Sequence, residues 1–332
     1  MSTVTDSANK RTDRSATTIS RIAVGVDGRP EGNDAVALGA MLAKATDAEL
    51  MLVAVHPEPL VVLPEEMNWK SLELQAATLL RETRDAMAPH ARLVVETDLS
   101  VPRALERVVR RERRDLLVVG SSRHGPEGRV RIGKRTRQLL SHFKSALAIA
   151  PRGAHGDTKL QLRRIAVGFD GGKESNAALA LAASLASDAG AELLVCGVVD
   201  DRVPSVGWLA LPAGGADVAR REEAVLAETY ALREFGLNGA RAAGVEARAE
   251  VLRGRPADAL LALSDKADLL VIGSRRWGAV SRLLLGSTGE ALAHDAACPL
   301  LIVPRPAAET DPWFRRQPSR PRTDDRYGRL RP

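Results

Sequence analysis

The chain contains one sequence twice, and this duplication limits its fold more than any other feature. The segment Arg21–Gly28 (RIAVGVDG) returns 143 residues later as Arg164–Gly171 (RIAVGFDG). The segment Asp115–Ser121 (DLLVVGS) returns 153 residues later as Asp268–Ser274 (DLLVIGS). Two constant offsets separated by one jump indicate that a whole domain was duplicated and that the second copy then gained about ten residues. We place the added residues in Trp208–Asp217, because its Pro-Ala-Gly-Gly stretch is a poor helix former.

Each copy has the size of an ordinary domain that can bury its own core. The chain is 45% hydrophobic but only 3% aromatic, so valine, leucine, isoleucine and alanine must build both cores. We predict a disordered N-terminal tail, a first domain, a linker, a second domain and a disordered basic tail, at residues 1–20, 21–152, 153–163, 164–305 and 306–332.

The excess positive charge lies in the two tails and not in the predicted domains. The formal net charge is +6, of which the tail up to Arg21 carries +2 and the tail from Arg305 onward carries +4. The domains together are therefore neutral, which makes nucleic acid an unlikely partner. The proline-rich C-terminal tail lacks hydrophobic periodicity and is predicted to be solvated. A tail that binds a partner through Trp313 and Phe314 is the alternative.

The cellular location is predicted from three features that concern cysteines and apolar segments. Cys196 and Cys298 are too few for a disulfide framework in 332 residues, and free thiols suit a reducing compartment. The N-terminal twenty residues contain no apolar stretch that resembles a signal peptide. No apolar run reaches the length of about 18 residues that a membrane span requires. We therefore expect a cytoplasmic protein without a membrane partner.

Short aliphatic segments alternate with longer amphipathic segments in both halves. The aliphatic segments predict five strands in each half: Arg21–Asp27, Glu49–His56, Ala91–Asp98, Asp115–Gly120 and Ser145–Ala150, then Arg164–Asp170, Ala191–Val199, Val245–Leu252, Asp268–Gly273 and Cys298–Val303. The amphipathic segments of the first half predict helices at Asn33–Thr46, Lys70–Ala88, Arg103–Arg114 and Arg135–Phe143. Near-continuous apolar strands are typical of parallel sheets that are covered on both faces. The predicted fold class is α/β, with two tandem, doubly wound, five-stranded parallel-sheet domains of the Rossmann-like type.

A ligand of such a sheet binds outside the carboxyl ends of the strands, where the strand order reverses. The residues that we expect at this edge are the acids after the first strands and the small residues around the fourth strands and the following helices: Asp27, Gly120 and Gly133 in the first half, and Asp170, Gly273, Gly286, Ser287 and Thr288 in the second. Glycines at these places let backbone amides approach a phosphate, and the helix dipole favours an anion. A carboxylate can accept a hydrogen bond from a ribose hydroxyl or an adenine amine.

Together these strand ends resemble the universal stress protein family, and the second half carries the closer match. The matching residues there are Ile165–Gly171, Gly254–Pro256, Gly273–Arg276, Leu283–Thr288 and Cys298–Pro304. Members of the family that bind ATP have a glycine, two residues, a glycine, nine residues, and then Gly-Ser or Gly-Thr. Gly273, Gly286 and Ser287 fit this spacing, but Arg276 replaces the middle glycine. In the first half Gly120 and Gly133 fit, whereas Arg123 and Lys134 depart from the pattern.

The resemblance implies an adenine-nucleotide site, with ATP as the ligand. In the second half it places Asp170 and Val198 near the base and ribose, and Gly273, Arg276, Gly286, Ser287 and Thr288 around the phosphates. The corresponding residues of the first half are Asp27, Val55, Gly120 and Gly133. We expect the second half to be the better site, because Lys134 puts a bulky side chain where the pattern has a hydroxyl.

The implied function is that of a tandem universal stress protein, a nucleotide-responsive regulatory module without dedicated catalysis. A weak ATP hydrolase or nucleotide-transfer enzyme on the related fold is one alternative, although the sequence shows no assembled nucleophile and base. A scaffold without a ligand is the other alternative. It would follow if Arg123, Lys134 and Arg276 filled the phosphate space.

Several other patterns have simpler explanations. Gly128–Lys134 fits a phosphate-binding P-loop, but it does not follow a strand end directly and lacks the final Ser or Thr. Asp27 and Asp170 could be phospho-acceptors or could cap their own turns, and the Ser287-Thr288 pair could cap its own helix. His294 and Cys298 are four residues apart, without further metal ligands nearby in the sequence.

The two halves are expected to form a dimer-like pair within the chain. Paired single domains of the family commonly meet along their fifth strands, and an unpaired apolar edge strand promotes aggregation. We therefore predict that Ser145–Ala150 and Cys298–Val303 pack together. Dimerisation of the whole chain is an expectation of the resemblance alone.

Overall fold

The computed structural model describes residues 18–56, 69–141, 143–157, 160–199, 215–274 and 285–304. The first half contains, in chain order, β1 (Arg21–Val26), α1 (Pro30–Thr46), β2 (Glu49–His56), α2 (Trp69–Met87), β3 (Arg92–Thr97), α3 (Val101–Arg111), β4 (Leu116–Gly120), α4 (Lys134–Leu140) and β5 (Ala146–Ala150). A short 3-10 helix, η1 (Ala154–Gly156), follows. The second half contains β6 (Arg164–Phe169), α5 (Lys173–Ala189), β7 (Glu192–Val199), α6 (Gly215–Ala242), β8 (Ala247–Arg253), α7 (Pro256–Ser264), β9 (Leu269–Gly273), α8 (Ser287–Asp295) and β10 (Leu300–Val303).

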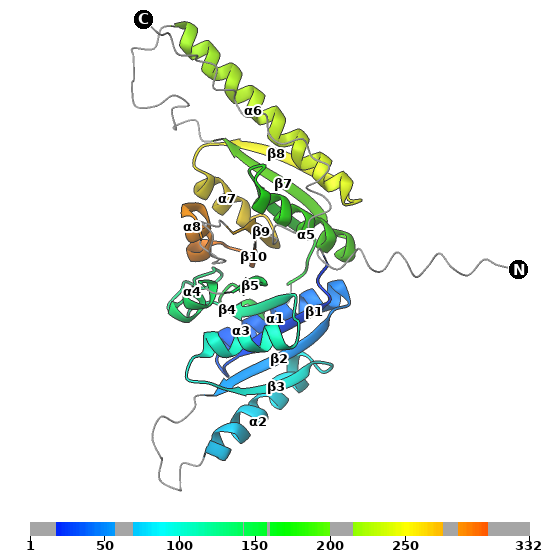
Figure 1. The fold of residues 1–332 in the computed structure, drawn as a ribbon, viewed down its shortest axis with the longest axis vertical. Coiled ribbons are helices and arrows are strands. Elements are labelled where there is room, and N and C mark those ends of the chain that lie inside the picture. The colour runs from blue at the N-terminus through cyan, green and yellow to red at the C-terminus, as the bar shows by residue number, and fades with distance from the viewer. Residues whose placement is uncertain are drawn as a thin grey trace, which may run out of the picture.

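The ten strands form one continuous sheet in the order β3-β2-β1-β4-β5-β10-β9-β6-β7-β8. All neighbours within each half are parallel, as predicted for a doubly wound fold. The halves meet at β5 and β10, which pair antiparallel with Ala148 opposite Leu301. The prediction that the fifth strands pack together is therefore confirmed, and each half supplies the other with the strand partner that its edge needs (Figure 1).

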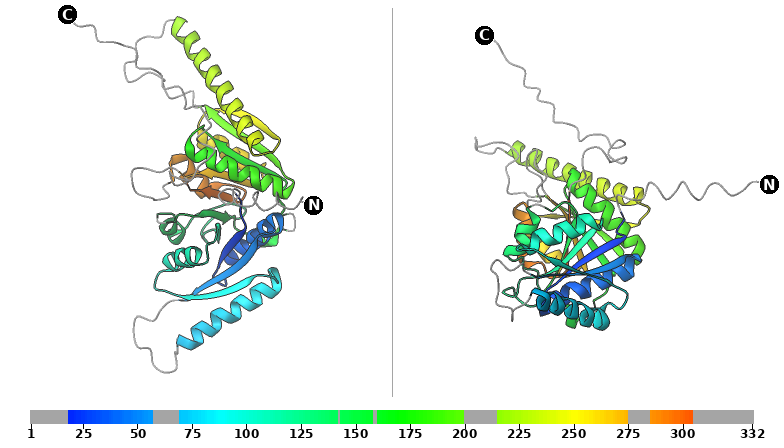
Figure 2. Two further views of the ribbon diagram at one scale, coloured as in Figure 1. Left: turned by 45° about the vertical axis from the view of Figure 1, so that its right-hand side comes forward. Right: turned by 60° about the horizontal axis from the view of Figure 1, so that its bottom comes forward.

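Helices cover both faces of this sheet, and each face has its own apolar core (Figure 2). One core lies under α1, α2, α5 and α6, and the other lies under α3, α4, α7 and α8. Strand residues alternate between the two cores, as Val24 and Ala23 of β1 illustrate. Every residue of β5 is buried. This double coverage explains why the strand sequences are nearly continuous runs of aliphatic residues.

The residues added to the second half lengthen a helix, which differs from the sequence-based prediction. The helix α6 has 28 residues, whereas its counterpart α2 has 19. The predicted insertion Trp208–Asp217 overlaps the first residues of α6, and its remainder lies outside the described residues. Glycine is unfavourable inside a helix but is accepted at the end, which explains why Gly215 can begin α6.

The connection from the first to the second half is bound to α1 by a buried carboxylate. Asp34 is fully buried, and its Oδ2 accepts a hydrogen bond of 2.9 Å from the Gly153 amide. Its Oδ1 accepts a second bond of 2.9 Å from the His155 amide and also contacts the His155 ring. The chain turns here through a left-handed conformation at Gly153, with φ +84°. Asp34 therefore fixes the path by which the chain leaves the first half.

Candidate functional site

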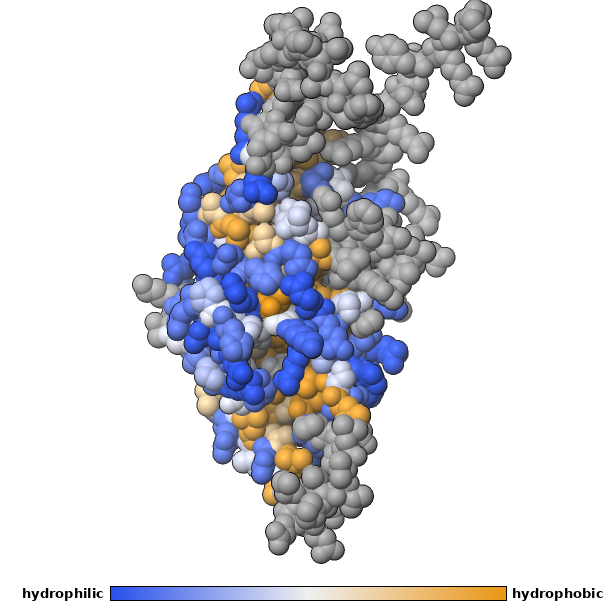
Figure 3. Space-filling view, turned by 90° about the vertical axis from the view of Figure 1, so that its left-hand side faces the viewer, coloured by the Kyte–Doolittle hydropathy of each residue, from blue (hydrophilic) through white to orange (hydrophobic). Residues whose placement is uncertain are grey.

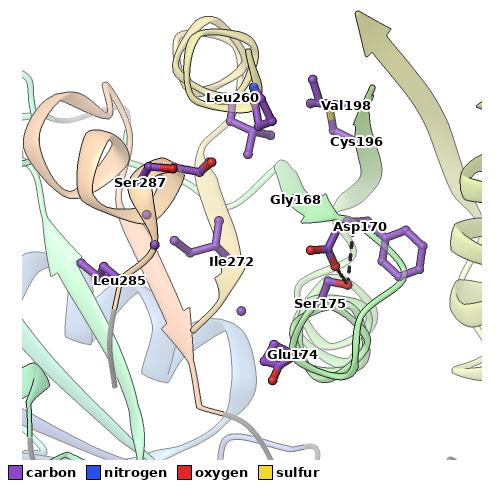
Figure 4. Close-up of a pocket in the computed structure, with 16 residues that line it drawn as sticks. Gly168, Asp170, Glu174, Ser175, Cys196, Val198, Leu260, Ile272, Leu285 and Ser287 are labelled. Atoms are coloured by element: carbon purple, nitrogen blue, oxygen red, sulfur yellow. Dashed lines mark hydrogen bonds between the residues drawn. The ribbon is translucent and has the colours of Figure 1, made fainter. Parts of the chain in front are cut away.

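A cavity of about 370 Å³ opens at the carboxyl ends of β6, β7 and β9. This is the place where the strand order of the second half reverses, since β6 pairs with β7 on one side and with β9 on the other. The cavity is bounded by Asp170 after β6, by the start of α8, and by α7 (Figure 4). Asp170, Val198, Gly273, Gly286, Ser287 and Thr288, which the sequence predicted as site residues, all line it.

Asp170 stands at the turn between β6 and α5 and is held there by hydrogen bonds. Its Oδ1 accepts a bond of 2.8 Å from the Gly172 amide and a bond of 2.7 Å from the Ser175 hydroxyl. Gly171 makes the turn possible, because its φ of +74° is unfavourable for residues with a side chain. The turn-capping role, one of the three roles considered for this aspartate, is thus present. No hydrogen bond from a described residue reaches the second carboxylate oxygen, Oδ2.

Apolar side chains from three elements form the part of the cavity beside Asp170. Cys196 and Val198 come from β7, Leu260 from α7 and Ile272 from β9 (Figure 4). Gly168 of β6 leaves room for this cluster, because a Cβ atom at that position would lie 3.1 Å from Leu260 Cδ1. Burial raises the pKa of the Cys196 thiol to about 12, so the thiol is a neutral part of this surface.

The amino terminus of α8 faces the cavity from the side opposite Asp170 (Figure 4). Gly286 is the N-cap residue, and among the described residues no side chain makes a capping hydrogen bond to this helix. Ser287 and Thr288 are its first two residues, so the predicted capping role for this pair is not what the structure shows. The first amides of a helix have no partner within the helix, and together with the helix dipole they attract an anion.

Gly120 and Gly273 have a structural function that the sequence did not reveal. A Cβ atom on Gly120 would fall on the backbone carbonyl of Glu31, and one on Gly273 would lie 2.5 Å from the backbone carbonyl of Glu174. The first turns of α1 and α5 therefore press directly on the ends of β4 and β9. Both positions require glycine for this packing even though Gly273 also lines the cavity.

The predicted residues of the first half lie at the equivalent strand ends. Asp27 follows β1, Val55 lies near the end of β2, Gly120 ends β4, and Gly133 is the N-cap residue of α4. The surroundings of the aspartate differ from those in the second half. Gly32 stands where the second half has Ser175, and Asp27 Oδ1 accepts a longer bond of 3.2 Å from the Arg29 amide.

The segment that fits a P-loop pattern belongs to the junction between the halves. The amides of Val130 and Ile132 donate hydrogen bonds of 2.8 and 2.9 Å to carbonyl groups at the end of α8. Arg129 Nη1 also donates to the carbonyl of Asp295, at 2.8 Å. Amides that are engaged in this way are unavailable to a phosphate, which argues against a P-loop.

Charged side chains surround this junction on the side that carries α4 and α8, where the surface is mainly hydrophilic (Figure 3). Arg137 Nη1 lies 2.8 Å from Glu290 Oε2, and Arg137 Nη2 lies 2.9 Å from His294 Nε2. The ring of His294 is thus hydrogen-bonded to Arg137 and not to Cys298. Burial raises the pKa of the Cys298 thiol to about 12, so this thiol is neutral. The described residues contain no group of three or more side chains that could hold a metal ion.

Some predictions concern residues outside the described part of the chain. They include Arg276, residues 1–17 of the N-terminal tail, the C-terminal tail and the Trp313-Phe314 pair. Of the residues predicted as a disordered N-terminal tail, Ile19 is instead buried in the core and Ser20 is hydrogen-bonded to Asp115. Arg123 is described, and its Nε lies 3.1 Å from the ring of His124. Among the described helices, none is long and apolar enough to cross a membrane.

Apart from the apolar lining, two polar cavity residues escaped the sequence analysis. Ser175 and Glu174 belong to the first turn of α5 and line the cavity beside Asp170. Glu174 has a counterpart in Glu31, whereas Ser175 has a glycine as its counterpart. An alignment of the two copies shows this difference between Gly32 and Ser175, and it could have identified Ser175 as a candidate site residue.

The fold and the site together define a protein of two doubly wound α/β domains, joined edge to edge, with an open cavity at the switch point of the second. The sequence pattern of the universal stress protein family matches residues 18–151 and 161–304. The chain therefore belongs to the universal stress protein family, with two such domains in tandem, as the sequence analysis predicted.

Relatives of known sequence and structure agree with this membership. A universal stress protein of Mycolicibacterium smegmatis is 29% identical over 307 residues, covering 85% of this chain and 96% of that protein. A universal stress protein of Thermus aquaticus is 35% identical over 143 residues, covering 42% of this chain and 98% of that protein. The crystal structure of a universal stress protein from Archaeoglobus fulgidus covers 86% of this chain and 98% of its own, with a TM-score of 0.60 and 19% identity. That structure has the same tandem extent and supports the fold.

Proposed function

We propose that the protein is a nucleotide-responsive regulatory module that binds ATP in the cavity of its second domain. The observation that carries this proposal is the meeting of three chemically different surfaces in one cavity. An apolar patch, a carboxylate and an uncapped helix terminus match the base, the ribose and the phosphates of an adenine nucleotide.

The apolar patch of Cys196, Val198, Leu260 and Ile272 suits the faces of a purine ring. Asp170 borders this patch, and its Oδ2 can accept a hydrogen bond from a ribose hydroxyl. The cavity volume of about 370 Å³ lies at the small end of the range for ligand pockets. We expect the phosphates to extend over the start of α8 toward solvent.

The phosphates would be bound chiefly by the first amides of α8. Gly286, Ser287 and Thr288 present small groups there, so a phosphate can come close to the backbone. The hydroxyl groups of Ser287 and Thr288 add donors. Arg276 replaces a glycine of the ATP-binding pattern, and it remains a proposed phosphate ligand because of its place in the sequence and its charge.

The second domain is proposed as the stronger site. In the first domain α4 begins with Lys134 and Arg135, and the preceding segment is bound to α8 of the other half. Positive charge there could attract a phosphate from a distance, but a bulky side chain restricts access to the backbone amides. We therefore assign Asp27, Val55, Gly120 and Gly133 to a weaker site.

Calorimetric titration of the full chain with ATP tests the proposal. Asp170→Ala should weaken binding by about five- to hundredfold, which corresponds to the loss of roughly 1–3 kcal/mol from one hydrogen-bonded contact. The matched variant Asp27→Ala changes the equivalent residue of the first domain and should leave the main binding event unchanged. Gly286→Val and Gly133→Val form a second pair, and only Gly286→Val should abolish the tight site.

The results separate this proposal from its alternatives. If Asp27→Ala removed binding and Asp170→Ala did not, the domain preference would be reversed. Absence of any heat of binding from the folded chain would favour a ligand-free scaffold. Phosphate release measured on the same preparation would identify a hydrolase, whereas the proposed module should bind ATP without turnover.

A further inference from the structure

The ten-stranded sheet ends in two strands with one open edge each, β3 in the first half and β8 in the second. Their outward amide and carbonyl groups have no strand partner in the chain that the structure describes. Such an edge can pair with a strand of another molecule unless side chains prevent it. The two edges differ in how their charged side chains are used.

The charges of β3 are paired within the first half. Glu96 forms ion pairs of 2.9 and 3.1 Å with Arg107 and Arg111 of α3. Arg92 forms an ion pair of 2.9 Å with Glu112 just after α3. The charged side chains of β3 are therefore paired with residues of α3 and with Glu112 just after it. Charged side chains on an edge strand commonly prevent it from pairing with another molecule.

Arg248 and Glu250 of β8 have no such partners on a helix among the described residues. The corresponding helix α7 has the sequence PADALLALS and contains no basic residue. Glu250 consequently has no ion pair with any described residue. Arg248 lies 3.1 Å from Glu192, but their side chains are 81% and 43% exposed, and a pair this exposed contributes little. Of the three charged residues of β8, Arg248 and Glu250 are thus available to an outside partner, and Arg253 ends the strand.

We propose that β8 is a homodimerisation edge, on which the β8 strand of a second copy pairs antiparallel about a two-fold axis at Ala249. In this register Arg248 of each copy lies directly opposite Glu250 of the other, so two complementary ion pairs form. Ala247 lies opposite Val251 on the other face of the sheet, also twice. The pair Arg248 and Glu250 is therefore complementary to itself about Ala249, and a symmetric dimer requires that property. Arg253 lies outside the paired residues in this register.

This pairing joins the two sheets into one and places both α6 helices on the same face of it. The helix α6 packs against β7 and β8 and forms the outer margin of the second half (Figure 1). It carries two exposed apolar side chains one helical turn apart, Leu226 at 48% and Tyr230 at 64% exposure. The dimer brings these side chains of the two copies onto the same side of the joined sheet.

The first test measures the mass of the intact chain by light scattering during size exclusion. A single strand pair is a small interface, so the dimer should be weak. We expect the mass to rise toward twice the 35.5 kDa of one chain as the concentration is raised to about 100 µM. Arg248→Glu places like charges opposite each other twice and should weaken dimerisation about tenfold or more. The double variant Arg248→Glu/Glu250→Arg exchanges both charges, keeps the complementarity and should restore the dimer. Arg92→Glu, the matched change on β3, should have no effect on the mass.

The second test is a cysteine crosslink at the two-fold axis. Residues directly opposite each other in antiparallel strands have Cα atoms about 4.5–5.5 Å apart, which a disulfide can span. Ala249→Cys should therefore give a covalent dimer on mild oxidation, whereas Val94→Cys on β3 should not. Cys196 and Cys298 are buried and give little background.

Each contrary result overturns the proposal. A chain that stays monomeric throughout the concentration range leaves no role for the β8 edge. A dimer that survives Arg248→Glu and does not crosslink through residue 249 uses another surface. A double variant that stays as monomeric as Arg248→Glu, while folded by circular dichroism, rules out the charge register.

Discussion

The Ser175 hydroxyl donates a hydrogen bond of 2.7 Å to Asp170 Oδ1, and this bond joins the first turn of α5 to the end of β6 (Figure 4). The Gly172 amide donates to the same oxygen. With Oδ1 engaged twice, the carboxylate has one orientation, and Oδ2 is left for a ligand. The first half has Gly32 at the equivalent position and cannot make this bond.

Replacement of this hydroxyl tests whether orientation of Asp170 matters for binding. Ser175→Ala should weaken ATP binding about fivefold, a loss of roughly 1 kcal/mol, because the carboxylate gains freedom. Ser175→Thr keeps the hydroxyl and should bind like the native chain in the same calorimetric titration. If the alanine variant lost thermal stability but kept its ATP affinity, the bond would be structural only.

The glycines at the ends of β4 and β9 should tolerate no side chain. Gly120→Ala would place a Cβ on the carbonyl of Glu31, and the required backbone shift should cost about 3 kcal/mol or more. Gly273→Ala meets Glu174 in the same way, at 2.5 Å. Gly156→Ala is the control, since a Cβ there meets nothing within 4 Å. In urea denaturation, Gly156→Ala should keep a near-native free energy of unfolding, whereas Gly120→Ala and Gly273→Ala should both show a lower one.

The sequence predicted the strands well because they depend on the spacing of aliphatic residues. Repetition of Arg21–Gly28 indicated two domains, and the family resemblance indicated that they meet along their fifth strands, Ser145–Ala150 and Cys298–Val303. The strands and the repeat can be recognised from neighbouring residues in the sequence, without knowing which distant residues are in contact. The doubly wound topology then indicated the strand ends at which the cavity lies.

The remaining features depend on contacts between distant residues. The length of α6 was missed because Gly215 was interpreted as a helix breaker rather than as a helix start. The steric role of Gly120 depends on where the backbone of Glu31 lies, and the binding of Gly153 by Asp34 joins residues 119 positions apart. Neither relation leaves a pattern in the sequence.

The two thiols should be unreactive in the folded chain. Burial raises the pKa of Cys196 and of Cys298 from 9.0 to about 12, so almost no thiolate exists at pH 8. A thiol reagent that absorbs on reaction should detect both cysteines in denaturant and neither in buffer. Rapid labelling of one thiol under native conditions would mean that its side of the sheet opens.

The same pKa shifts predict how stability depends on alkaline pH. Between pH 9 and 12 the unfolded chain releases thiol protons that the folded chain retains, so the free energy of unfolding should fall as pH rises. Below pH 9 both states are protonated and these groups have no effect. Cys196→Val introduces the residue that the first half has at this position, Val53, and should make the decline shallower. The free energy of unfolding would be measured by chemical denaturation from pH 8 to 10.5. If it fell equally steeply in Cys196→Val and in the native chain, groups other than Cys196 would cause the decline.

The last prediction concerns the carboxylate that binds the connection between the halves. Asp34→Ala leaves the Gly153 and His155 amides without their buried acceptor and should cost about 2–4 kcal/mol. Asp34→Asn keeps one acceptor oxygen and should cost less. Because the bond fixes the connection and not the sheet, trypsin should cut Asp34→Ala faster after Arg152 or Arg163, even where the β5–β10 pairing persists. Equal cleavage rates in Asp34→Ala and the native chain, with equal unfolding midpoints, would show that the junction of β5 and β10 alone holds the halves in place.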